Sequence, residues 1–184
     1  MNFSCDPLRV SYLETKKFED FRGSSIKVFE HEDGRPVSQF LFNFTGKKNT
    51  FRGLHTQLSE MSEQKVIYCL SGNLTWFAIN FASDRDSSDW LTCQELPLSP
   101  EQAIYIPNFH LNGMVSHTDD VVLAILASRP FDSRHGVNVT PFGESFFEEQ
   151  VEKYDLKNAI FDEKADFMSQ TQFISLIDSK VQHD

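Results

Sequence analysis

Four consecutive residues, Arg52-Gly53-Leu54-His55, combine an anion-binding side chain with one that can move a proton, and Lys65 follows ten residues after the histidine. A neutral imidazole accepts protons near pH 7. A fixed ammonium stabilises developing negative charge, and a guanidinium can hold a phosphate through two hydrogen bonds. These residue types would suit proton abstraction from an anionic substrate. A lone histidine in a strand is more often structural than catalytic. The residues around the histidine therefore have to indicate which of the two roles it has.

Two other segments could add polar groups to the same site. Asp20-Phe21-Arg22-Gly23 lies upstream and offers a second arginine, and a later segment runs from Ile106-Pro107 to Asn112-Gly113. His110 in the later segment would share a strand face with Asn112, because side chains two residues apart on a strand point to the same side. The sequence therefore offers a local basic cluster in a chain whose net charge is -10.

Short apolar runs separated by polar turns predict the strands that must position these side chains. The expected strands cover residues 25–29, 39–44, 65–70, 74–81, 91–96, 103–106 and 121–127. Many short strands at regular spacing favour a sandwich or a barrel. Residues 74–81 are almost wholly apolar, so we expect this strand to be buried on both faces. The 18 phenylalanines also favour strands, and we expect them to fill the barrel interior.

The C-terminal part of the chain differs in character. Residues 144–156 and 165–181 have helix-like spacing and more charge. Because a segment of about 40 residues rarely folds alone, we expect residues 1–184 to form one domain. The C-terminal helical extension, from about residue 143 to residue 184, would then pack on the outside of the barrel.

Composition argues against several classes of function. Nucleic-acid binding needs a basic surface, whereas this chain is acidic. No apolar run approaches the roughly 20 residues of a membrane span, and the first residues lack the pattern of a secretion signal. The three cysteines are widely spaced, and no two have metal-ligand spacing. We therefore expect a reduced, cytoplasmic protein with neither nucleic acid nor membrane as a partner.

The ordered set of motifs resembles the dTDP-4-dehydrorhamnose 3,5-epimerases, a family of nucleotide-sugar epimerases in the cupin superfamily. That family has an Arg-Gly-Leu-His segment, a lysine ten residues later, a strand ending at a glycine turn (here Gly72) and an Asp- and Ser-rich loop ending in tryptophan (here Trp90). The order holds from about residue 18 to about residue 140. The resemblance implies an all-β cupin fold, a double-stranded β-helix or jelly roll with C-terminal helical segments.

The resemblance also implies a reaction and roles for individual residues. Members of the family epimerise a nucleotide-linked 4-keto-6-deoxy sugar at C3, C5 or both through an enolate, without a metal or another cofactor. His55 would be the base, Lys65 would stabilise the enolate oxygen, and Asp166 would orient the histidine with a one-residue shift. The residues that would hold the substrate are Arg22, Arg52, Gln57, Asn43, His110 and Asn112. The implied partners are a nucleotide-diphosphate sugar, expected to be dTDP-linked, and a second copy in a homodimer with strand exchange, in deoxysugar or polysaccharide biosynthesis.

Two departures from the family pattern leave alternatives open. Asn112 stands where the family has a second histidine, and no tyrosine falls near residues 123–125, where the family's acid is expected. Loss of a general acid slows a reaction by about 10²- to 10⁴-fold. The enzyme could epimerise one centre only, use another acid such as His110, Tyr68 or water, act as a 3,4-ketoisomerase, or bind sugar nucleotides without catalysis.

A metal-dependent cupin is a further alternative. Its ligands would come from His55, Gln57, a glutamate at 60 or 63, and His110. One of these ligands is a glutamine, and Lys65 would stand beside the metal. We therefore expect no metal.

Overall fold

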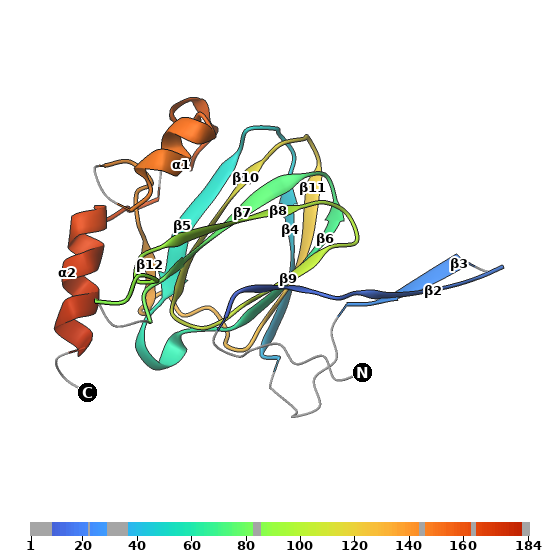
Figure 1. Ribbon diagram of the computed structural model, residues 1–184, viewed down its shortest axis with the longest axis horizontal. Coiled ribbons are helices and arrows are strands. Elements are labelled where there is room, and N and C mark those ends of the chain that lie inside the picture. The colour runs from blue at the N-terminus through green and yellow to red at the C-terminus, as the bar shows by residue number, and fades with distance from the viewer. Residues whose placement is uncertain are drawn as a thin grey trace.

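Two antiparallel sheets of five strands each form the body of the protein (Figure 1), and the computed structural model describes residues 9–21, 23–28, 37–82, 86–143, 146–162 and 165–181. The first sheet contains, in spatial order, β1 (Ser11–Leu13), β9 (Ala103–Ile106), β6 (Lys65–Ser71), β11 (Val121–Ala127) and β4 (Gln39–Thr45). The second contains β12 (Gly136–Asn138), β5 (Phe51–Gln57), β10 (His110–Ser116), β7 (Leu74–Asn80) and β8 (Cys93–Leu98). This arrangement confirms the expected all-β jelly-roll fold.

The central strands of the second sheet are buried on both faces. Every residue of β10 is buried, and in β7 every residue except Asn80 is buried. The expectation for residues 74–81 is thus confirmed. The next strand begins later than expected: β8 starts at Cys93, because Leu91 has a φ of 54° and forms part of a turn.

Two apolar layers hold the fold together. The inner layer, between the two sheets, is mainly aliphatic and contains Ile67, Trp76, Ile104, Met114, Leu123 and Ile125. The outer layer lies between the second sheet and the C-terminal segments and contains Phe51, Leu54, Phe77, Phe147, Phe173 and Ile177. All four phenylalanines that are buried among the described residues belong to the outer layer. The expectation that phenylalanines fill the barrel interior is therefore wrong, because the buried phenylalanines pack between the second sheet and the C-terminal extension.

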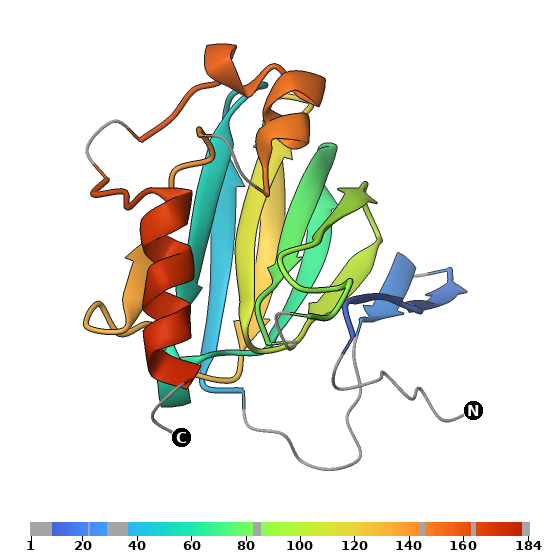
Figure 2. The same cartoon turned by 60° about the vertical axis from the view of Figure 1, so that its left-hand side comes forward.

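The C-terminal extension is helical over shorter stretches than expected. It contains α1 (Glu148–Lys153), the short 3-10 helix η2 (Leu156–Asn158) and α2 (Gln170–Val181), and a second 3-10 helix, η1 (Ser59–Met61), lies earlier in the chain. Helix α2 starts at residue 170 because Ser169 and Gln172 form a capping box: the Ser169 Oγ accepts the Gln172 backbone N–H, and the Gln172 Oε1 accepts the Ser169 N–H. Figure 2 shows α2 alongside the second sheet. No helix in the described ranges combines the length and apolar character needed to cross a membrane.

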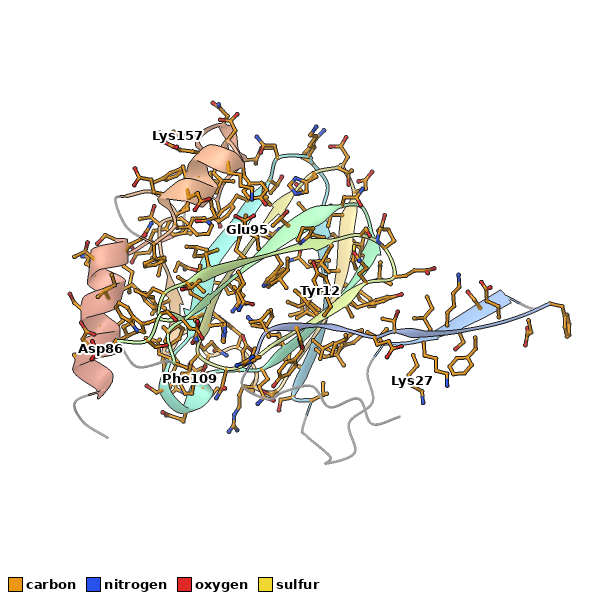
Figure 3. The ribbon with its side chains drawn as sticks, viewed as in Figure 1. Tyr12, Lys27, Asp86, Glu95, Phe109 and Lys157 are labelled. Atoms are coloured by element: carbon orange, nitrogen blue, oxygen red, sulfur yellow. The ribbon has the colours of Figure 1, made fainter. Side chains whose placement is uncertain are left out.

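A two-stranded hairpin, β2 (Lys16–Asp20) and β3 (Gly23–Lys27), projects from the body of the protein (Figure 1) and is called the arm here. All five residues of β2 are exposed, and Lys27 at the end of β3 can be followed in Figure 3. The expected site residue Arg22 lies outside the described residues.

Candidate active site

Strand β5 carries the Arg-Gly-Leu-His segment, and an irregularity in this strand puts Arg52 and His55 on the same side. In regular alternation, residues three apart face opposite ways. Here the pairing with β10 shifts by one residue, so that Asn112 faces His55 while Gly113 faces Gly53. This β-bulge reverses the alternation. As a result Phe51 and Leu54 enter the outer layer, whereas Arg52 and His55 line a cavity between the sheets.

Gly53 makes the bulge possible. Its φ is +111°, a region that residues with a side chain rarely adopt. A Cβ atom at this position would lie 2.5 Å from the carbonyl oxygen of Asn112 and 2.7 Å from the Cα of Gly113. Both are backbone atoms of the central strand β10, so neither can move aside easily. The glycine of the motif is therefore a structural requirement for placing the histidine.

The cavity between the sheets, called the main cavity, has a volume of about 550 Å³ and receives side chains from both sheets. The first sheet contributes Leu41, Lys65 and Ile125, and the second contributes His55, Trp76 and Met114. Lys65 and His55 face the same space from opposite walls, and their electrostatic coupling is strong enough to lower the pKa of the histidine. The ten-residue spacing of the sequence thus corresponds to two adjacent groups in one cavity.

Burial is the larger influence on His55. The half-buried imidazole loses much of its hydration, which disfavours the charged form, and the nearby Lys65 ammonium acts in the same direction. Together they lower the pKa of His55 to about 3. His55 is consequently a neutral imidazole throughout the physiological pH range, the form that can accept a proton.

Lys65 forms an ion pair with Glu63 in the wall of the main cavity. The Lys65 Nζ lies 2.9 Å from the Glu63 Oε1, and the two side chains are only 7% and 11% exposed. A buried ammonium needs such a partner, because an unpaired charge in an apolar wall is costly. The pair holds the ammonium in the cavity where an oxyanion could approach it.

Arg52 is exposed but oriented by two contacts with strand β4. Its Nε donates to the Thr45 Oγ at 2.9 Å, and its Nη2 donates to the carbonyl oxygen of Phe44 at 3.0 Å. Thr45 in turn donates to the Asn43 Oδ1 at 3.1 Å. Arg52 and Asn43, two of the expected substrate-binding residues, therefore belong to one hydrogen-bonded group at the cavity wall.

Gln57 also lines the main cavity, but its side-chain amide forms hydrogen bonds with two separate loops. Its Nε2 donates to the carbonyl oxygens of Met61 and Pro130, and its Oε1 accepts the backbone N–H of Asp132. These contacts join the η1 segment to the loop between β11 and β12. Gln57 thus shapes the cavity through its loop contacts.

His110 and Asn112 lie on the inward face of β10 without lining the main cavity. The Asn112 Oδ1 accepts the indole N–H of Trp76 at 3.2 Å, so Asn112 holds a side chain that does line it. The His110 Nδ1 lies 2.9 Å from the carbonyl oxygen of Asn108, and burial lowers the pKa of this histidine. The structure thus places both residues behind the cavity wall.

A smaller cavity of about 400 Å³, called the side cavity, adjoins the main one and shares His55, Arg52, Asn43 and Asn138 with it. Its other wall comes from the C-terminal segment, which contributes Asp162 and Ala165. Asp166 is exposed, and it is not among the described residues that line either cavity. Among the described residues that line the side cavity, Asp162 is the one that supplies a carboxylate.

Sequence reasoning missed several residues that line the main cavity: Glu63 as a partner of Lys65, Trp76, Phe131 and Asn138. The signal for Glu63 was its position two residues before Lys65, which places both on one face of an extended segment. Ile125 faces the cavity near the position where the family tyrosine was expected, and its side chain cannot transfer a proton.

Of the ligands considered for a metal site, His55, Gln57 and Glu63 line the main cavity, whereas His110 does not. Across the described part of the chain, no three His, Cys, Asp or Glu side chains form a group that could hold a metal ion. His110 in particular points to Asn108 behind the cavity wall.

Comparison with known proteins identifies the family. The model of the dTDP-4-dehydrorhamnose 3,5-epimerase family matches residues 9–164. The chain belongs to this family. The dTDP-4-dehydrorhamnose 3,5-epimerase of Escherichia coli (strain K12) is 29% identical over 116 residues, which cover 60% of this chain and 63% of that protein. The chain therefore spans less than two thirds of the length of this curated relative.

Solved structures of family members share the fold. The dTDP-4-dehydrorhamnose 3,5-epimerase of Elizabethkingia anophelis NUHP1 superimposes with a TM-score of 0.75 at 19% identity, covering 94% of this chain and 97% of that one. The dTDP-6-deoxy-D-glucose-3,5-epimerase of Legionella pneumophila Philadelphia 1, in complex with dTDP-4-keto-L-rhamnose, gives a TM-score of 0.67 at 16% identity, covering 98% and 95%. At these identities the likeness establishes the cupin fold of the family.

Proposed function

We propose that this protein is an epimerase of nucleotide-linked 4-keto-6-deoxy sugars that works by proton abstraction beside the C4 ketone. The observation that carries the proposal is the convergence of His55 and Lys65 on opposite walls of one cavity, with the imidazole held neutral. Family membership and the dTDP-sugar complex of the Legionella relative support the substrate class.

In the proposed reaction His55 removes the proton from the carbon next to the ketone. The electron pair of the C–H bond becomes the C=C bond of an enolate, and negative charge develops on the C4 oxygen. The Lys65 ammonium stabilises that oxygen, the type of preorganised electrostatic contact that contributes most to such reactions. The roles require neither a metal nor another cofactor.

The nucleotide diphosphate would lie against Arg52 and the cavity mouth. A guanidinium carries five N–H donors, and the two contacts to β4 leave donors for a phosphate. Phe131 lines the cavity with 66% of its surface exposed, so it offers a platform on which a nucleobase could stack. Among the substrate contacts expected from the sequence, Arg52 and Asn43 have the most suitable positions.

A second candidate is a cupin that binds sugar nucleotides without catalysis, and one observation favours it. Ile125 occupies a cavity position near which the family acid was expected, and its side chain cannot transfer a proton. Two further alternatives are a 3,4-ketoisomerase and an epimerase that acts on a single centre. Both reactions begin with the same proton abstraction.

Isotope exchange separates these candidates. The protein is incubated in D₂O with a panel of dTDP-linked 4-keto-6-deoxy sugars, and deuterium at C3 and C5 is followed by NMR. The proposal expects exchange at one or both centres, at least about 10²-fold slower in His55→Ala. Measurable binding without exchange by any sugar would support the binding protein instead, and exchange unaffected by His55→Ala would exclude His55 as the base.

The proposal includes a homodimer, and two exposed apolar surfaces support it. Phe40, Phe42 and Phe44, called the aromatic stripe, lie on the outer face of the edge strand β4 and are each more than half exposed. The arm adds Phe18 and Phe21, which are 47% and 98% exposed. A two-stranded hairpin is marginally stable by itself in water, so we propose that the arm of one copy covers the aromatic stripe of the other.

A cytoplasmic location is part of the same proposal, and the free thiols of Cys69 and Cys93 are compatible with it.

A further inference from the structure

Glu63 lines the main cavity, and an ion pair with Lys65 does not by itself require that position. It is the only acidic side chain among the described residues that line the main cavity, and 11% of it is exposed. Lys65 contacts its Oε1. The second oxygen, Oε2, is therefore the atom of this carboxylate that could meet a ligand.

The backbone around Glu63 is anchored on both sides. The Ser62 Oγ accepts the backbone N–H of Phe109 at 2.7 Å. On the other side, the Gln64 N–H donates to the Ser128 Oγ at 2.9 Å, and the Gln64 carbonyl oxygen accepts the Ser128 N–H at 3.0 Å. A side chain held between two such anchors is preorganised, as a group that acts on a substrate has to be.

Glu63 belongs to the wall that faces His55. It lies two residues before the start of β6 in the first sheet, whereas His55 lies on β5 of the second sheet. Its neighbours on that wall, Ile125 and Ala127, have no titratable group. Tyr68 belongs to a cluster on the outer face of the first sheet, and His110 lies behind the cavity wall, so neither of these candidates for the missing acid lines the main cavity.

We propose that Glu63 is the catalytic residue that exchanges a proton with the sugar on the side opposite His55. The inference rests on the proposed epimerase function and adds the second proton-transferring group to it. Its position beside Lys65 lets one wall of the cavity both stabilise the enolate oxygen and reach the adjacent carbon.

Inversion needs one proton from solvent, because Glu63 starts as the carboxylate of the ion pair with Lys65 and His55 starts neutral. His55 takes the C–H proton, the C–H electron pair forms the enolate, and Glu63 takes up the solvent proton. The carboxylic acid of Glu63 then gives its proton to the opposite face of the same carbon, where the enolate electrons form the new C–H bond. Glu63 is left as a carboxylate and His55 as an imidazolium, and the proton returns through solvent.

Substitution of Glu63 by glutamine tests this role, because it keeps the size and the acceptor oxygen for Lys65 while removing proton transfer. Single-turnover reactions are run in D₂O with the panel of dTDP-linked 4-keto-6-deoxy sugars, and NMR follows deuterium uptake and inversion separately. We expect Glu63→Gln to slow inversion by about 10²- to 10⁴-fold. Deuterium uptake through His55 at the unchanged configuration should continue. Glu63→Asp, which keeps a carboxyl group, should invert faster than Glu63→Gln.

Glu60→Gln is the matched control, since Glu60 lies in the same segment with a side chain that is 75% exposed and outside the main cavity. It should invert at the rate of the unchanged protein. Circular dichroism and dTDP binding verify that each variant is folded. Inversion by Glu63→Gln at the original rate would overturn the proposal, and so would equal losses of uptake and inversion, which would make Glu63 a support for Lys65. Uptake and inversion both absent from the unchanged protein would instead reject the epimerase function itself.

Discussion

At the scale of single residues, His55 is governed by two influences that act against its protonated form. Burial removes hydration, and the Lys65 ammonium repels a second positive charge in the same cavity. A base with a depressed pKa is weaker, but it is always available at neutral pH. In the proposed reaction, the ammonium that weakens the base would also stabilise the enolate, so the same side chain would lower the free energy of the product of proton abstraction.

The depressed pKa of His55 has a direct consequence for the acid limb of the pH profile. For an imidazole with a pKa of about 6.5, the neutral fraction falls about 25-fold between pH 7 and pH 5. His55, with a pKa of about 3, stays neutral over this range. We therefore expect the kcat/KM for deuterium uptake, which reports the free enzyme, to stay nearly constant from pH 7 to pH 5. An acid limb centred between pH 6 and 7 would contradict this picture of the cavity.

The sequence was most informative about residues within one continuous motif. His55, Arg52 and Lys65 could be placed together because the spacing of the Arg-Gly-Leu-His segment and its lysine reflects two successive strands, one in each sheet, that face one cavity. Asp166 could not be placed in the same way, because the position of the C-terminal segment depends on how it packs against β5. The sequence suggests Glu63 only as a candidate metal ligand, because nothing in it reveals which charge pairs with Lys65.

At the scale of elements, the bulge in β5 decides which residues reach the cavity. The pattern Phe51, Arg52, Leu54, His55 does not alternate, and sequence periodicity alone gives no reason to expect its two polar residues on one side. The register shift opposite Asn112 explains the arrangement. The strand could be located from the motif, but its local geometry depends on contacts with the backbone of β10.

Replacing Gly53 by alanine should damage both stability and the site. A Cβ at this position meets backbone atoms of β10, and its φ of +111° is unfavourable for alanine. We expect a loss of about 3 kcal/mol in the free energy of unfolding, measured by urea denaturation, together with weaker dTDP binding. Gly46→Ala is the control, because a Cβ there meets nothing within 4 Å. Equal stability of the two variants would show that the bulge tolerates a side chain.

Helix α2 is fastened by a few aromatic contacts of the outer layer. Phe173 is fully buried, with its ring centroid 5.4 Å from that of Phe81. Phe173→Ala should therefore lower the free energy of unfolding by about 3 to 5 kcal/mol. Ser175→Ala on the exposed side of the same helix should change it by less than about 0.5 kcal/mol. A small effect of Phe173→Ala in urea denaturation would mean that α2 contributes little to the stability of the fold.

At the scale of the whole molecule, the surface is apolar at two distant places. The aromatic stripe lies at one edge of the first sheet, and the arm follows β1 at the opposite edge. The stripe residues alternate along β4 with Leu41 and Asn43, which line the main cavity. A partner that covers the stripe would therefore rest on a strand whose other face forms the site.

The dimer can be tested by measuring mass in solution. We expect sedimentation equilibrium to give about 42 kDa, twice the 21.2 kDa of one chain. Replacing Phe40, Phe42 and Phe44 by serine should shift the protein towards the mass of one chain. Phe131→Ser provides the control, since Phe131 is equally exposed but lines the main cavity. A monomeric unchanged protein would exclude the proposed pairing.

The loop contacts of Gln57 bear on how much ordering a ligand would require. One side-chain amide binds both the η1 segment and the β11–β12 loop, and that loop contributes Phe131 and Ser133 to the main cavity. This part of the cavity wall therefore has its shape before a ligand arrives. Binding would then lose little free energy to the ordering of this loop, which is how preorganisation raises affinity.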